Sequence, residues 1–322
     1  MGPTASGKTD LAIALTQYLP VDVISVDSAM VYKGMDIGSA KPSSEELAKA
    51  PHRLIDICDP VEPYSVADFC DDAETEIQRS IANGRIPLLV GGTMMYFKTL
   101  LDGLAEMPAT DASVRAAIAE EAERLGWPVL HEQLMAVDPD YARQLHPNHS
   151  QRISRALEVY RLSGRTMTSF REEQQASQID DTRLLANRFE VIQLALLPSE
   201  RSVLHTRIEK RFLQMLEQGF VEEVKQLRNR GDLHLDLPSM RSVGYRQVWH
   251  YLDALEDVNQ DYSYETMVHK GIVATRQLAK RQLTWLRGWS NLHQLPVDES
   301  MNGGTLQKNV EFILNFLPTK SI

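Results

Sequence analysis

The opening stretch of the chain has the residue types and the spacing of a phosphate-binding loop. It fits the pattern G-x-x-x-x-G-K-[ST] with Gly2, Pro3, Thr4, Ala5, Ser6, Gly7, Lys8 and Thr9. In such a loop the backbone N–H groups point at phosphate oxygens, the lysine adds a positive charge, and the threonine hydroxyl ligates Mg²⁺. We therefore predict a polyphosphate site with Thr9 on the metal. The alternative is an ordinary glycine-containing turn before a helix.

Asp27 is a second residue that could do chemistry. It follows the β-branched segment 21–26, and polar residues after a parallel strand lie at the edge where open α/β sheets bind ligands. Its carboxylate could ligate Mg²⁺ or act as a general base on a second substrate. The alternative is an aspartate that caps a turn or a helix. Gly91, Gly92 and Thr93 follow another apolar run in the same way, and glycines there let the backbone approach a ligand.

Three groups of basic residues are candidates for binding phosphates. Arg207 and Arg211 lie four residues apart near the start of an expected helix, and we expect one of them to hold the phosphates. Arg152 and Arg155 lie three apart on another expected helix. Residues 266–297 contain no Asp or Glu but several basic and aromatic residues, which suits a nucleic-acid backbone and unstacked bases. For each group, a solvated surface or core tryptophans remain the alternative.

The order of the expected elements predicts the fold class. Segments rich in β-branched and apolar residues read as strands at 21–26, 52–57, 86–90 and 189–196. Apolar residues repeat every three or four positions at 10–19 and 66–83, as in amphipathic helices. Alternating strands and helices behind a phosphate-binding loop indicate an α/β protein with a doubly wound parallel sheet, like that of P-loop NTPases. Because only Met1 precedes Gly2, we expect the strand that normally leads into such a loop to be missing.

The middle of the chain predicts an inserted helical subdomain. Charge-rich helices are expected from residue 111, and the polar stretch 165–188 has no clear periodicity and is typical of a mobile arm or linker. We therefore place the inserted subdomain at 111–185, within a core built from 1–110 and 186–322. In the second part of this core, long helices are expected over 200–230 and 265–286.

Bulk composition limits the class of protein. The 322 residues are 43% hydrophobic, enough for a sizeable core, and no apolar run has membrane-spanning length. The formal net charge of −10 argues against indiscriminate nucleic-acid binding but allows a local basic face. The two cysteines cannot make a disulfide framework, so we expect a reducing, cytoplasmic location. We expect a monomer with no membrane contact.

Taken together, these motifs resemble those of the bacterial tRNA dimethylallyltransferases, also called tRNA isopentenyltransferases. The resemblance covers nearly every segment in order: Gly2 to Thr9, Val26 to Ala29, Tyr32 to Gly38, Pro51 to Arg53, Val90 to Thr93, Gln151 to Arg155, Arg241 to Arg246 and Lys280 to Arg287. The chain departs from the family at the first strand. It also lacks the zinc-finger extension of some eukaryotic members, so no structural metal is expected.

The resemblance implies a reaction. A dimethylallyl group would pass from dimethylallyl diphosphate to N6 of adenine 37, next to the anticodon of tRNA, giving N6-isopentenyladenosine. Mg²⁺ on Thr9 would be the cofactor, and Lys8 with Arg211 would neutralise the departing diphosphate. Asp27, ionised at neutral pH, would remove the proton from N6, and Thr93 would help to position the base.

The resemblance also assigns tRNA contacts, so that the inserted subdomain becomes a tRNA-binding one that grips the anticodon stem-loop. The contacts are Asp27, Ser28, Ala29, Met30, Thr93 and Arg115; Gln151, Arg152, Ile153, Ser154 and Arg155; Arg241, Ser242, Val243, Gly244, Tyr245 and Arg246; and Lys280, Arg281, Gln282, Leu283, Thr284, Trp285, Leu286 and Arg287.

Three other functions stay open from the sequence. A P-loop kinase that uses ATP on a small acceptor would explain Lys8, Thr9 and Asp27 but not the basic segment. Prenylation of free adenine nucleotides would not need a surface for an anticodon. A nucleotide-dependent RNA-binding module without chemistry is the third.

Overall fold

Three parallel strands form the larger sheet, and its central strand is rich in β-branched residues. Val21–Val26 (β1) is flanked by His52–Arg53 (β2) and Ile86–Gly91 (β3), in the order β2-β1-β3. β1 pairs with β3 along its whole length, with Val26 opposite Gly91. The carboxyl ends of β1 and β3 therefore lie side by side, and this places the residues that follow them at one edge of the sheet.

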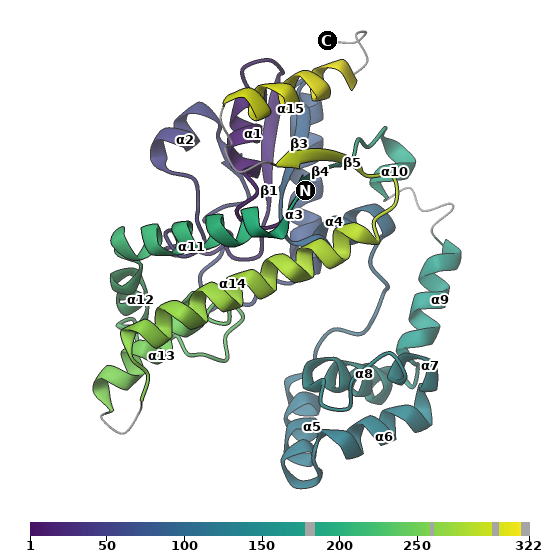
Figure 1. The fold of residues 1–322 in the computed structure, drawn as a ribbon. Helices are drawn as coiled ribbons and strands as arrows, with labels where there is room; N and C mark the ends of the chain where they lie inside the picture. Colours follow the sequence, from purple (N-terminus) through teal and green to yellow (C-terminus); the bar gives the residue numbers. More distant parts are fainter. Residues whose placement is uncertain (178–183, 258–260, 298–302, 317–322) are drawn as a thin grey trace. The chain divides into compact units, whose positions relative to one another are not determined.

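Two further parallel strands, Leu194–Pro198 (β4) and His293–Val297 (β5), form a second sheet. The first residue of the chain lies along β4 (Figure 1). The Met1 ammonium donates to the Leu194 carbonyl at 2.7 Å, and the Leu196 N–H donates to the Met1 carbonyl at 3.0 Å. That the strand which normally leads into the phosphate-binding loop is missing stays a prediction.

The computed structural model describes residues 1–177, 184–257, 261–297 and 303–316. The chain divides into two compact units, which we call the core unit (1–97 and 192–322) and the inserted unit (98–191). The sequence placed the inserted part at 111–185, and the structural division lies several residues further out at each end. The tRNA-binding role of that part stays a prediction.

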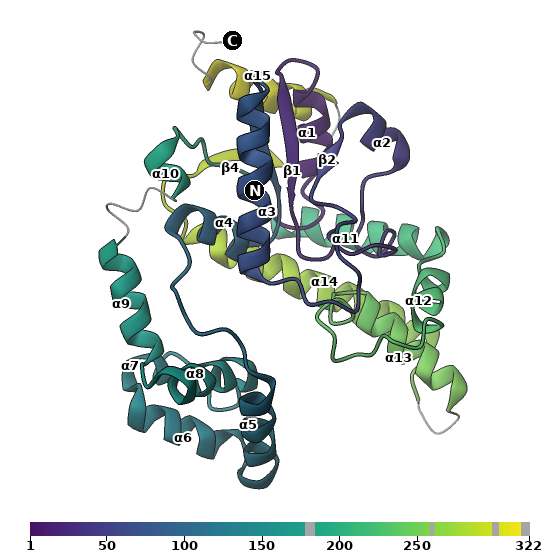
Figure 2. The same cartoon turned by 180° about the vertical axis from the view of Figure 1, so that it is seen from behind.

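Helices surround both sheets of the core unit. They are Lys8–Leu15 (α1), Ser44–Lys49 (α2), Val66–Ala82 (α3), Met94–Asp102 (α4, which runs on into the inserted unit), Arg201–Glu217 (α11), Phe220–Arg228 (α12), Tyr245–Glu256 (α13), Tyr264–Arg287 (α14) and Gly303–Phe316 (α15). α3 packs on β1 and β3, as the view from behind shows (Figure 2), and α1 packs on β3 and on α15. α11 and α14 lie against each other (Figure 1).

Two of the predicted elements in the core unit are wrong. The single helix expected over 200–230 is interrupted between α11 and α12, where Gly219 has a φ of 99°, a left-handed conformation that only glycine adopts readily. The strand expected over 52–57 is only two residues long. Leu54 and Asp56 have φ values of 61° and 55°, so the backbone leaves the extended conformation there.

The inserted unit is helical. Its helices are Ala112–Leu125 (α5), Trp127–Val137 (α6), Pro139–Ala142 (α7), Ser150–Ser163 (α8), Met167–Ser177 (α9) and Leu185–Arg188 (α10). The linker predicted over 165–188 is therefore wrong for most of its length, and its residues 178–183 lie outside the described residues. Tertiary contacts explain the difference, because Phe170 joins the core around Ile118 and Ile153, and Asp138 accepts a hydrogen bond from the Thr168 N–H at 3.0 Å.

The fold is thus mixed α/β, with a small parallel sheet and many helices. Whether it is doubly wound in the manner of P-loop NTPases stays a prediction. In the part of the chain that the structure describes, no helix has the length and apolar character needed to cross a membrane.

Candidate active site

The phosphate-binding pattern folds into a loop directly before α1. Gly7 caps the helix with a φ of 86°, and this left-handed turn aims the first N–H groups of α1 into the loop. The Lys8 ammonium donates to the Pro3 carbonyl at 2.7 Å and so bridges the loop. The Ser6 hydroxyl is buried and makes no hydrogen bond within the described residues. The loop therefore combines a helix N-terminus, a cation and an unused hydroxyl, a combination that suits anions.

The charge of Lys8 is perturbed by its surroundings in the site. Burial lowers the pKa of Lys8 from 10.5 to about 8, the nearby Asp27 raises it, and the positive charge of Arg211 lowers it. Burial likewise lowers the pKa of Arg211, with Asp10 and Asp27 opposing the shift. The charge of Arg211 thus disfavours the protonated form of Lys8, and a bound diphosphate would stabilise both cations.

Arg207 and Arg211 both lie on α11 and both line the cavity described below. The electrostatic influence of Arg211 on Lys8 places its charge near the phosphate-binding loop. Its Nη2 also donates to the Ala40 carbonyl at 3.4 Å. The influence of Arg211 on the pKa of Lys8 favours Arg211 over Arg207 for a phosphate contact.

Asp27 is half-buried at the end of β1 and uses one carboxylate oxygen in a turn. Its Oδ1 accepts the N–H groups of Ala29 at 2.9 Å and Met30 at 3.3 Å. Oδ2 makes no hydrogen bond to any described residue. The turn that the sequence left as an alternative role is therefore present, and it orients the carboxylate while leaving its second oxygen for a ligand.

Thr93 lies beside Asp27 because β1 and β3 end together. The Thr93 N–H donates to the Val26 carbonyl at 3.2 Å, and its Oγ1 accepts the Ser28 N–H at 3.1 Å. Thr93 therefore ties the loop after β3 to the turn that carries Asp27.

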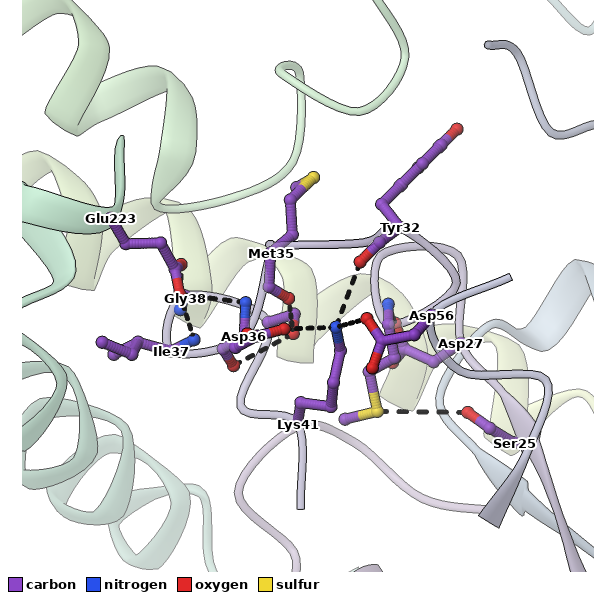
Figure 3. Close-up of polar contacts among 12 residues, drawn as sticks. Ser25, Asp27, Tyr32, Met35, Asp36, Ile37, Gly38, Lys41, Asp56 and Glu223 are labelled. Atoms are coloured by element: carbon purple, nitrogen blue, oxygen red, sulfur yellow. Dashed lines mark hydrogen bonds and ion pairs between the residues drawn. The ribbon is translucent and has the colours of Figure 1, made fainter. Parts of the chain in front are cut away.

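An irregular loop over residues 35–41 forms another wall of the site, and Figure 3 shows how it is held. The Glu223 carboxylate on α12 accepts three consecutive backbone N–H groups, from Asp36 at 3.0 Å, Ile37 at 2.6 Å and Gly38 at 3.1 Å. It also accepts the hydroxyl of the buried Tyr245 at 2.7 Å. A single half-buried carboxylate thus satisfies three consecutive N–H groups of this turn.

Lys41 closes the same loop from its other side (Figure 3). Its side chain is 5% exposed, and its Nζ contacts carboxylate oxygens of Asp36 and Asp56, each at 2.5 Å, and the Tyr32 carbonyl at 3.1 Å. The cation is thus saturated by the protein itself. We conclude that Lys41 shapes the loop, whereas Lys8 is the cation that remains for a ligand.

One cavity of about 1640 Å³ in the core unit joins these groups. Its walls come from the phosphate-binding loop, the turn after β1, the 36–47 segment, the loop after β3, α11, the 241–245 turn and α14. Lys8, Thr9 and Arg211 line one part of it, and Asp27 and Thr93 line another. The cavity can therefore hold an anion and a second reactant together.

The structure separates the predicted tRNA contacts of the core unit into outward and inward side chains. On α14, Lys280, Arg281 and Arg287 are exposed, whereas Gln282 and Leu286 are buried. Trp285 is 44% exposed, so the alternative that it belongs to the hydrophobic core is wrong. In the 241–246 turn, Arg241 and Arg246 are exposed, Ser242 and Val243 are half-buried, and Gly244 and Tyr245 are buried.

In the inserted unit, two of the predicted arginines are engaged by an acid. Glu158, whose side chain is fully buried, accepts hydrogen bonds from Arg155 at 2.9 Å and Arg115 at 3.2 Å. Arg155 also donates to the Pro108 carbonyl at 2.8 Å. Ile153 is buried in the helical core, and Gln151 and Arg152 are exposed. Arg152 is thus the cation of this segment that faces solvent, and the tRNA role of all of them stays a prediction.

Comparison with known proteins places this geometry in a family. A family model described as IPP transferase matches residues 30–289, and a second, described as isopentenyl transferase, matches residues 1–58. The chain belongs to the IPP transferase family. Members of this family are transferases.

Solved structures of IPP transferases resemble the chain over nearly its full length. A tRNA isopentenylpyrophosphate transferase from Bacillus halodurans is 34% identical, with a TM-score of 0.67, over 98% of this chain and 94% of that one. Its counterpart from Staphylococcus epidermidis is 33% identical, with a TM-score of 0.66, over 98% and 96%. A eukaryotic dimethylallyltransferase acting on tRNA is 26% identical, with a TM-score of 0.75, over 99% of this chain and 79% of that one.

Sequence reasoning missed the side chains that hold the site together. Glu223 was one acid among many on an expected surface helix, and Lys41 was only part of an irregular connection. Nothing in the local pattern distinguishes an acceptor for three distant N–H groups from a solvated glutamate. The role of Glu223 depends on contacts with residues more than 180 positions away in the sequence.

Proposed function

We propose that this IPP transferase moves a dimethylallyl group from dimethylallyl diphosphate to N6 of adenine 37 in tRNA. The observation that carries the proposal is the single cavity that joins Lys8 and Arg211 to Asp27. Alkyl transfer from a diphosphate needs a cationic cradle for the leaving group and an acceptor site beside it. The kinship with tRNA-modifying enzymes supports tRNA as the acceptor.

The diphosphate half of the reaction uses the phosphate-binding loop. The N–H groups at the start of α1 and the charges of Lys8 and Arg211 bind the diphosphate and stabilise the negative charge that grows as it leaves. Thr9 is the residue that would hold Mg²⁺, and the ion would supply further positive charge to the phosphate oxygens. The residues fit such an ion, because Thr9 lines the cavity with a hydroxyl oxygen, and Mg²⁺ is usually held by few protein oxygens together with substrate phosphates.

The acceptor half uses Asp27 and Thr93. The adenine amine attacks the first carbon of the dimethylallyl group, the N6–carbon bond forms, and the carbon–oxygen bond to the diphosphate breaks. The free Oδ2 of Asp27 takes the proton that N6 loses, and diphosphate departs with the bonding electron pair. An adenine in a stacked anticodon loop must first swing out, at a cost of a few kcal/mol. We also keep the proposal that the core is a doubly wound P-loop fold.

The direct test incubates the protein with unmodified tRNA, labelled dimethylallyl diphosphate and Mg²⁺, followed by mass analysis of the anticodon stem-loop. We expect a single added dimethylallyl group at adenine 37. Consumption of ATP in the absence of tRNA, without any prenyl transfer, would instead support a kinase.

Asp27→Ala tests the general base. We expect it to keep tRNA affinity and to lose roughly 10²- to 10⁴-fold in single-turnover rate, because a positioned base contributes about that much. Asp27→Asn serves as the isosteric control, since it keeps an acceptor for the Ala29 N–H but cannot take a proton. An unchanged rate in both variants would leave Asp27 with only its role in the turn.

A further inference from the structure

Gln282 on α14 makes two hydrogen bonds that join separate loops of the site. Its side chain is 7% exposed. Its Oε1 accepts the Thr4 N–H at 2.8 Å, and its Nε2 donates to the Gly92 carbonyl at 2.9 Å. The carboxamide thus joins Thr4 to Gly92, which lie about 90 positions apart in the sequence. Gln282 itself lies nearly 200 positions after Gly92.

The two loops that Gln282 joins carry the two halves of the proposed reaction. Thr4 belongs to the phosphate-binding loop, four residues before Lys8. Gly92 directly precedes Thr93, which accepts the Ser28 N–H and so supports the turn of Asp27. The Gln282 side chain therefore connects the diphosphate half to the acceptor half through one rigid group of atoms.

The burial of Gln282 argues against a direct contact with tRNA. Its neighbours Arg281 and Trp285 on α14 are exposed, whereas Gln282 faces the interior with both ends of its amide engaged. A carboxamide offers a donor and an acceptor at a fixed separation, which charged or apolar side chains do not. This is the chemical property that a bridge between an N–H group and a carbonyl requires.

We infer that Gln282 is a positioning residue that sets the spacing between the bound diphosphate and the base acceptor. The inference rests on the proposed function. The displacement requires the reacting carbon to lie between the leaving oxygen and N6, and a misplacement of about 1 Å can lower the rate about 10²-fold. Gln282 lines the cavity, but both ends of its amide are engaged by the Thr4 and Gly92 backbones, and it acts through them.

Two substitutions of Gln282 separate the two hydrogen bonds of this bridge, which we call its arms: the one from the Thr4 N–H and the one to the Gly92 carbonyl. Gln282→Glu keeps an acceptor for the Thr4 N–H but faces the Gly92 carbonyl with a second oxygen, so only one arm is lost. Gln282→Leu has a similar size and loses both arms. Gln277→Leu is the matched control, because Gln277 is exposed on the same helix. Gln282→Glu differs least from the native side chain. If Gln282→Leu does not fold, Gln282→Glu is the variant that is compared with wild type and with Gln277→Leu.

A substitution from the opposite side tests the same contact. A Cβ added at Gly92 would lie 2.4 Å from Gln282 Nε2, so Gly92→Ala must displace the amide. In the Gly92→Ala, Gln282→Ala double variant this clash is absent. If the bridge is the cause, the two changes are not additive, and the double variant has about the rate of Gln282→Ala alone.

The experiment measures single-turnover prenyl transfer at saturating dimethylallyl diphosphate, tRNA Kd by filter binding, and hydrogen exchange of the Thr4 amide. We expect Gln282→Leu to lower the rate about 10- to 100-fold, to leave tRNA Kd within about twofold, and to speed Thr4 exchange. Gln282→Glu should lower the rate with less effect on Thr4 exchange, and Gln277→Leu should behave as wild type.

A weaker tRNA Kd with an unchanged saturated rate would overturn the inference and make Gln282 a tRNA contact. Additive losses in the double variant would also overturn it. Thr4 exchange reports on the bridge without any prenyl transfer. An inactive wild type with Gln282-dependent Thr4 protection would therefore refute the proposed function and not the bridge.

Discussion

At the scale of single residues, the charge of Lys8 is the quantity on which diphosphate binding depends in the proposed reaction. Burial and the nearby Arg211 keep the pKa of Lys8 at about 8, against 10.5 for an ordinary lysine, although Asp27 opposes them. Below that pH the ammonium is protonated and can bind an anion. Above it the free enzyme loses the proton, so part of the binding energy must be spent on taking it up again.

We therefore predict that KM for dimethylallyl diphosphate is constant below about pH 7.5 and rises above about pH 8, approaching about tenfold per pH unit. Steady-state assays at saturating tRNA between pH 6.5 and 9.5 measure this. Lys8→Arg is the control, because arginine stays charged throughout the range and its profile should be flat even if its KM is higher. A flat wild-type profile would show that Lys8 is not the cation that binds the diphosphate.

The residues of the site differ in how far sequence alone could find them. Lys8 and Thr9 belong to a local sequence pattern, and Asp27 directly follows a predicted strand. Their neighbours in the sequence are therefore enough to identify them as candidates. Gln282 and Glu223 act on loops that are distant in sequence, and their residue types are common on helix surfaces. A helical position alone does not tell whether an amide or a carboxylate faces water or a buried N–H group.

At the scale of elements, the 35–41 loop is held by Glu223 on α12, a helix that is distant from it in the sequence. We predict that Glu223→Gln destabilises the protein by about 1–3 kcal/mol, because an amide cannot accept all four hydrogen bonds that the carboxylate accepts. Amides 36, 37 and 38 should exchange faster, since they lose a charged acceptor.

Thermal unfolding and amide exchange measure the effect, and Glu222→Gln, on the exposed neighbouring position, is the matched control. Tyr245→Phe should give a smaller loss, because it removes one donor and leaves the carboxylate in place. If exchange at 36–38 is the same in Glu223→Gln as in Glu222→Gln, the loop does not need this anchor.

Glu158 plays a similar part for the helices of the inserted unit. Burial alone would raise the pKa of Glu158, but hydrogen bonds from Arg155 and from the Asp111 N–H, and the charge of Arg115, lower it below its ordinary value of 4.5. A carboxyl group with a lowered pKa stabilises the fold above its unfolded pKa, and this stabilisation is lost as pH falls through the folded value.

We predict that Glu158→Gln lowers the free energy of unfolding by about 1–3 kcal/mol at neutral pH, and that its difference from wild type shrinks below about pH 4.5. Urea titrations from pH 7 down to about pH 3 measure this. Glu120→Gln, on an exposed position of α5, should behave as wild type. A difference that stays constant down to the lowest pH would contradict the assignment of the effect to the Glu158 charge.

At the scale of the whole molecule, a chain of net charge −10 must bind a polyanion through local basic faces. Lys280 on α14 and Arg152 on α8 are exposed cations on two such faces. We predict that Lys280→Ala or Arg152→Ala weakens tRNA binding and lowers the slope of log Kd against log salt by about one each. Filter binding at several salt concentrations measures it, with Lys308→Ala on α15 as the control. A slope equal to that of the control removes the residue from the interface.

The errors in the predicted fold also belong to this scale. The 165–188 stretch lacks helical periodicity, yet α9 and α10 form in it, and neighbouring helices supply contacts to α9. The 200–230 segment has helical periodicity throughout, yet Gly219 interrupts it. Local pattern is a weak guide wherever tertiary packing supplies more free energy than backbone propensity.

By itself, the sequence determined which residue types stand together: the pattern of a phosphate-binding loop, a carboxylate after a strand and separate basic segments. These depend on short spacings, which a chain expresses without reference to the rest of the fold. Only the tertiary structure decided which arginines line the cavity and which pair with Glu158, and which side chains support the loops. Those assignments depend on burial and on hydrogen bonds between distant residues, and free energies of this kind exist only once the chain has packed.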